Sequence, residues 1–68
     1  MSKDYAISRA YDKIALVKKF ENNPETQATA WTKATGYLEA LLDMGIISAE
    51  EWTVIDRKLF QAFTGLED

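Results

Sequence analysis

Cysteine and histidine are both absent from the sequence. Their absence excludes disulfide bonds, zinc fingers, cysteine-bound iron–sulfur clusters and the commonest metal sites of proteins. A chain of 68 residues lies near the size at which one hydrophobic core supplies only ~3–5 kcal/mol of net stability. Helix packing and association with another chain are therefore the means of stabilisation that remain.

Turn-forming residues and long apolar runs are also scarce. Three glycines and one proline are too few for the many turns of an all-β fold. The longest apolar run, residues 38–47, is interrupted by Glu39 and Asp43, and none approaches the ~18 residues of a membrane span. The N-terminal segment is charged throughout and lacks the apolar stretch of a signal peptide. We therefore expect one cytoplasmic domain over residues 1–68, with no membrane partner.

The residues that are present favour a folded domain with an uneven charge. Hydrophobic residues make up 47% of the chain and include two Trp, three Tyr and three Phe, which is too apolar for a disordered tail. The net charge of −3 divides into +2 over residues 1–21 and −5 over residues 22–68. This asymmetry favours pairing within the chain or with a partner, whereas a nucleic-acid binder normally presents a strongly basic face.

Apolar residues recur at helical spacing in three segments, which predicts helices over residues 4–20, 24–44 and 49–63. The connections are short, so neighbouring helices should run antiparallel. The predicted fold is all-α, a compact three-helix bundle that could dimerise; a helical hairpin with a loosely docked first helix is the alternative. The predicted apolar faces comprise Ile7, Ala10, Tyr11, Ile14 and Val17, then Ala30, Trp31, Ala34, Tyr37, Leu38, Leu41 and Leu42, then Trp52, Ile55, Leu59, Ala62 and Phe63.

The helix ends have clear local signals. Asn23 is a good N-cap for the second helix. Ser48 and Glu51 have the spacing of a capping box at the start of the third. Gly45 follows the second helix and is expected to end it in a left-handed conformation, and Gly65 is expected to close the third helix.

Five apolar residues fall outside the predicted core faces and are the candidate interaction residues: Tyr5, Leu16, Phe20, Val54 and Phe60. Helix ends could cover them, and singly exposed apolar residues are normal. Alternatively, they form a second buried surface, most simply a dimer interface or a groove for a partner.

Carboxylates supply a second set of candidates. Asp56 lies close to the third apolar face, either as a boundary residue that reaches water or as a buried contact of Tyr11 or Lys18 that sets the register of packing. An acidic surface that is either solvated or faces a basic partner comprises Glu39, Asp43, Glu50 and Glu51.

Catalysis and direct DNA binding are both disfavoured. Without His or Cys, a nucleophile would need a carboxylate or lysine base, and so small a bundle has little volume for a substrate pocket. No calcium-binding loop is present. In a helix-turn-helix interpretation, Glu50 and Glu51 would face DNA phosphates with the wrong sign of charge. We expect no enzymatic activity, no cofactor, no metal and no small-molecule substrate.

Residues 38–52, LEALLDMGIISAEEW, followed by an amphipathic segment from Val54 to Phe63, resemble the SHOCT-type short helical hairpin over residues 37–63. The resemblance implies a helical hairpin that associates with itself or binds a protein partner. In general style the short, acidic, cysteine-free chain is also similar to small accessory proteins of phages and mobile elements. The leading hypothesis is a protein-protein interaction or self-association module. The alternatives are an acidic regulator of a host nucleic-acid-handling protein and, less favoured, a DNA binder.

Overall fold

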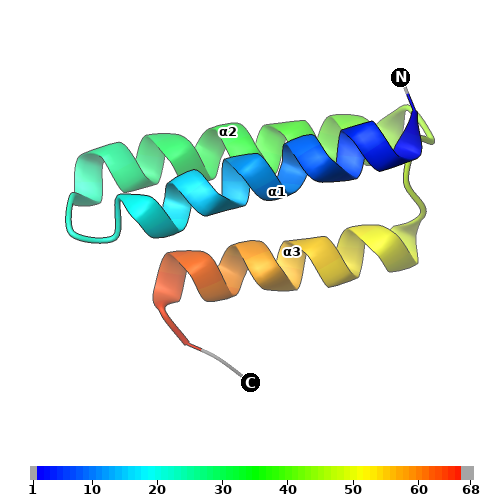
Figure 1. Cartoon of the computed structure of the whole chain (residues 1–68). Coiled ribbons are helices and arrows are strands. Elements are labelled where there is room, and N and C mark those ends of the chain that lie inside the picture. Colours follow the sequence, from blue (N-terminus) through cyan, green and yellow to red (C-terminus); the bar gives the residue numbers. More distant parts are fainter. Residues whose placement is uncertain (1, 67–68) are drawn as a thin grey trace.

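A computed structural model describes residues 2–66 and contains three helices in an antiparallel bundle (Figure 1). Helix α1 spans Lys3–Lys19, α2 spans Pro24–Asp43 and α3 spans Ala49–Thr64. Each helix packs against the other two, and α1 buries four of its residues. The predicted three-helix bundle is therefore confirmed, with every helix end within one residue of its predicted position.

Short polar side chains begin all three helices, because the first backbone N–H groups of a helix have no partner within it. The Asn23 side chain accepts a hydrogen bond from the Thr26 N–H, as predicted. Ser48 and Glu51 form the predicted capping box, in which each side chain accepts from the backbone N–H of the other. Ser2 caps α1 by accepting a hydrogen bond from the Tyr5 backbone N–H, which the sequence analysis did not anticipate.

Gly45 and Gly65 end α2 and α3, as predicted, and both adopt the left-handed conformation, which was predicted for Gly45 alone. Gly45 has φ 71° and Gly65 has φ 74°. After α2, the Gly45 N–H donates to the Leu42 carbonyl and the Ile46 N–H donates to the Leu41 carbonyl. These two bonds form a Schellman motif, which satisfies the last carbonyls of α2 and turns the chain toward α3.

The core consists of alanine and aliphatic side chains. One polar residue is buried beside it: Gln27 donates from Nε2 to the Val17 carbonyl at 3.1 Å and so ties the start of α2 to the end of α1. Most of the buried residues lie on the predicted faces, and Ala6 and Ile47 join them. The ten buried hydrophobic residues are Ala6, Ala10, Ile14, Val17, Ala34, Leu38, Leu41, Ile47, Ile55 and Leu59.

Three residues that the sequence analysis assigned to the core faces are exposed instead: Tyr11, Trp31 and Phe63. Each lies at the edge of its helical stripe, beside rather than between the neighbouring helices. Small alanines at Ala6, Ala10 and Ala34 fill the centre of the bundle, where the helices leave no room for a ring. The prediction that these three aromatic residues belong to the core was therefore wrong.

Candidate protein-interaction surfaces

None of the two Trp, three Tyr and three Phe residues lies in the buried core. Three of them, Phe20, Tyr37 and Trp52, are half-buried, and the other five are exposed. Aromatic rings bury more apolar area than any other side chain when they are covered, so a fold usually places several of them inside. In this bundle five aromatic residues are exposed, whereas Tyr37 and Trp52 pack partly buried against the core.

Exposed rings from α2 and α3 gather where α2 begins and α3 ends. The ring centroids of Trp31 and Phe63 are 5.6 Å apart and their planes are tilted by 42°, a favourable arrangement for an aromatic pair. Phe60 lies three residues before Phe63 on α3, so it is a neighbour on the helix surface, and it is 56% exposed. We call Trp31, Phe60 and Phe63 the aromatic patch.

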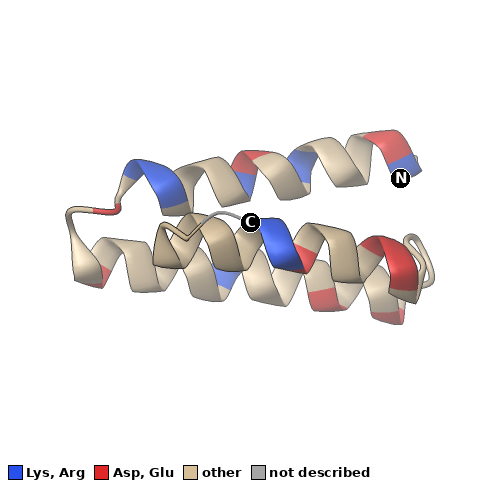
Figure 2. Ribbon diagram, turned by 90° about the horizontal axis from the view of Figure 1, so that it is seen from below, with Lys and Arg blue, Asp and Glu red and all other residues tan. Residues whose placement is uncertain are grey.

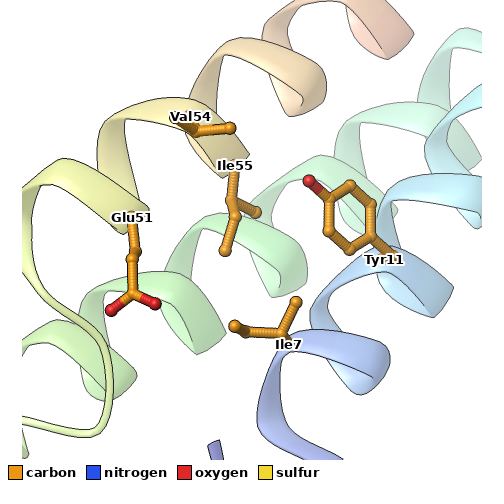
Figure 3. Close-up of a pocket in the computed structure, with 5 residues that line it drawn as sticks. All are labelled: Ile7, Tyr11, Glu51, Val54 and Ile55. Carbon is orange, nitrogen blue, oxygen red and sulfur yellow. The ribbon is translucent and has the colours of Figure 1, made fainter. Parts of the chain in front are cut away.

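A shallow apolar groove runs between α1 and α3 (Figure 3). Its volume is about 210 Å³, and its lining consists of Ile7, Tyr11, Glu51, Val54 and Ile55. Ile55 is buried at the floor, whereas Tyr11 from α1 and Val54 from α3 remain exposed on the two sides. Tyr11 points from α1 across the groove toward α3. The sequence analysis named Val54 but placed Ile7, Tyr11 and Ile55 in the core.

The carboxylate of Glu51 is held by contacts at the end of this groove. Its Oε1 accepts from the Ser48 backbone N–H at 2.9 Å and lies 3.0 Å from Lys3 Nζ. The hydrogen bond from the Ser48 backbone, followed by that from Lys3, lowers the pKa of Glu51 below its usual range. Glu51 is therefore a charged capping residue that links α3 to α1. It is less available to a partner than the other residues of the predicted acidic surface.

The five candidate interaction residues do not form one patch. Tyr5 and Leu16 are exposed on α1, and Phe20 is half-buried at the end of this helix, where the Lys19 ammonium lies 5.6 Å from its ring. Val54 and Phe60 are six residues apart, which places them about 120° apart around α3. Val54 thus belongs to the groove and Phe60 to the aromatic patch.

The acidic candidates lie at one end of the bundle, where α2 ends and α3 begins (Figure 2). Glu39, Asp43 and Glu50 are exposed there. Asp56, in the middle of α3, is half-buried. Lys18, one of its two predicted partners, instead lies 3.1 Å from Glu21.

None of the helices described over residues 2–66 combines the length and the apolar character needed to cross a membrane. In the same part of the chain, no three carboxylates converge as they would around a metal ion. Comparisons with protein-family models, with curated proteins and with solved structures find no match. The resemblance of residues 37–63 to SHOCT-type hairpins therefore stays a prediction.

Proposed function

We propose that this protein is a non-enzymatic protein-binding module and that the aromatic patch is its contact surface. The observation that carries the proposal is that five of the eight aromatic residues are exposed, three of them in one group on α2 and α3. Trp and Phe are enriched at protein interfaces, where a few such side chains supply most of the binding energy.

The aromatic patch supports binding rather than chemistry. Its side chains are hydrocarbon rings apart from the indole N–H of Trp31, so the patch itself has no acid, base or nucleophile. Burying a fully exposed Phe side chain is worth about 1.5–3 kcal/mol, so covering the 56% of Phe60 that is exposed contributes roughly half of that to a complex. Because Trp31 and Phe63 already contact each other, a partner meets a partly ordered surface and loses less side-chain entropy on binding.

Photocross-linking in the native host tests this proposal. A photoreactive phenylalanine analogue at Phe60 should give a discrete cross-linked species larger than the chain itself. The matched control places the same analogue at Thr29, which is exposed on α2 but lies outside the aromatic patch. Cross-links at Phe60 that disappear in Phe63→Ser, with helical circular dichroism unchanged, would support the aromatic patch. Equal cross-linking at both positions, or none at Phe60, would contradict it.

The acidic end of the bundle favours a second candidate function, that of a regulator that binds a basic surface of a nucleic-acid-handling protein. Glu39, Asp43 and Glu50 are exposed at this end. Binding of this kind should weaken steeply as salt is raised, because exposed charges are screened. A partner whose affinity stays constant between low and high salt would exclude this alternative and favour the aromatic patch.

A further inference from the structure

The face that carries the α1–α3 groove has a charge pattern distinct from that of the aromatic patch. Its centre is apolar, with Tyr11 39% exposed and Val54 58% exposed over the groove. The first turns of α1 and α3 lie at the same end, because Lys3 Nζ is 3.0 Å from Glu51 Oε1. The two helices therefore run in the same direction along the groove, and their charge patterns can be compared residue by residue.

On α3, Glu50, Val54 and Lys58 follow one another at intervals of four residues, so they lie along one ridge of the helix. All three are exposed. Glu50 precedes Val54 by ~6 Å along the helix axis, and Lys58 follows Val54 by the same distance. The ridge is thus acidic, then apolar, then basic, and it is symmetrical in spacing about Val54.

Helix α1 repeats this order at a longer spacing. Asp4, Tyr11 and Lys18 are separated by seven residues each, which is close to two helical turns, and all three are exposed. The acidic position again lies toward the shared helix starts and the basic position toward the other end. Lys18 has a neighbour in Glu21 at 3.1 Å, but an exposed pair of this kind contributes only ~0–1 kcal/mol and is readily exchanged.

We propose that this groove face binds a second copy of the chain. A two-fold axis lying in the interface, across both helices at the level of Tyr11 and Val54, packs α1 against α1 and α3 against α3 in antiparallel pairs. Glu50 of each copy then faces Lys58 of the other, and Asp4 faces Lys18 in the same way. The apolar side chains over the groove meet at the centre.

The charge order selects this arrangement over its alternative. A two-fold axis running along the groove, parallel to the helices, would pack α1 of each copy against α3 of the other in parallel. It would bring the acidic positions Asp4 and Glu50 together at one end and the basic positions Lys18 and Lys58 together toward the other, and like charges at an interface oppose association. The bundle measures 33 × 23 × 16 Å, so a single face buries at most about the ~800 Å² per partner of a standard interface.

Sedimentation equilibrium on the full chain, at several concentrations, tests the dimer through paired charge reversals. Glu50→Lys and Lys58→Glu should each weaken dimerisation about tenfold, because both symmetry-related pairs lose their attraction. The variant that carries both substitutions exchanges the charges and should recover to within about threefold of the original dissociation constant.

Matched controls distinguish a loss of interface contacts from the effects that a charge reversal has on net charge and on helix stability. Glu25 occupies the second position of α2 as Glu50 does that of α3, and both are exposed first-turn carboxylates. Glu25→Lys should therefore leave dimerisation unchanged, and so should Lys33→Glu on α2. A protein that stays monomeric at all concentrations would overturn the proposal. So would single variants that dimerise as tightly as the original chain, or a double variant that dimerises no more tightly than the single variants.

The experiment is independent of the proposed function, since the aromatic patch lies on another side of α3. Phe63→Ser should abolish cross-linking through the analogue at Phe60 yet leave the dissociation constant of the dimer unchanged. If Phe63→Ser weakens the dimer and the charge reversals do not, the second copy binds the aromatic patch and the groove proposal fails.

Discussion

Replacing Gly36 with alanine should stabilise the protein. Gly36 lies in the interior of α2 and is exposed, and a Cβ atom built there meets nothing within 4 Å. Glycine in a helix interior is ~0.8–1 kcal/mol less favourable than alanine, because it loses more backbone freedom on folding. For a domain of this size, a gain of about 1 kcal/mol raises the melting temperature by roughly 4–8 °C.

Gly45→Ala makes the same chemical change as Gly36→Ala but should destabilise the protein. A Cβ atom there also meets nothing within 4 Å, so free space does not distinguish the two positions. The difference is the backbone, since Gly45 has φ 71° and the left-handed conformation costs a residue with a Cβ atom ~1–2 kcal/mol. Part of this cost is offset by the lower entropy of the unfolded chain, so Gly45→Ala should destabilise by about 1 kcal/mol.

Urea and thermal unfolding followed by far-ultraviolet circular dichroism would measure both changes. The protein should be at a concentration low enough to keep it monomeric, because association would add to the apparent stability. Equal urea dependence of the free energy in all variants would show that each substitution changes stability without changing the compactness of the unfolded chain. A neutral or destabilising Gly36→Ala, or two variants that change in the same direction, would refute this account of α2 and its C-terminal turn.

Three further substitutions test the core, the capping box and the buried amide. Leu38→Ala should cost ~2–5 kcal/mol and leave much of the chain unfolded by circular dichroism, since Leu38 is almost fully buried; a cost below 1 kcal/mol would contradict its place in the core. Contacts in the folded state lower the pKa of Glu51, so the carboxylate stabilises the fold fully at pH values above 4.5, the ordinary pKa of a Glu side chain. This contribution is lost as the pH falls through the lower pKa that Glu51 has in the folded protein, so Glu51→Gln should flatten the acid limb of a stability–pH curve. An unchanged curve would show that Glu51 has no favourable contact in solution. Gln27→Ala should destabilise by ~1–3 kcal/mol through loss of the bond to the Val17 carbonyl, and Gln61→Ala, a half-buried control on α3, should cost less by urea unfolding.

The candidate surfaces were only partly predictable from the sequence. Val54 and Phe60 stood out because they lie off the apolar stripe of α3, and both are exposed. Trp31, Phe63 and Tyr11 were missed because each lies at the margin of a stripe, where periodicity does not say whether a neighbouring helix covers the residue. The exposure of such a margin depends on the positions of the other two helices.

The sequence by itself determined where the helices begin and end. Asn23, Ser48, Glu51 and Gly45 act through hydrogen bonds and backbone angles that involve residues no more than five positions away, and such effects are legible in a short stretch of chain. Only the tertiary structure decided that Lys3 meets Glu51, 48 residues later in the chain, and that Tyr11 and Val54 share one groove. These contacts depend on how three helices pack together, and helical periodicity specifies which side of each helix is apolar but not which neighbour it meets.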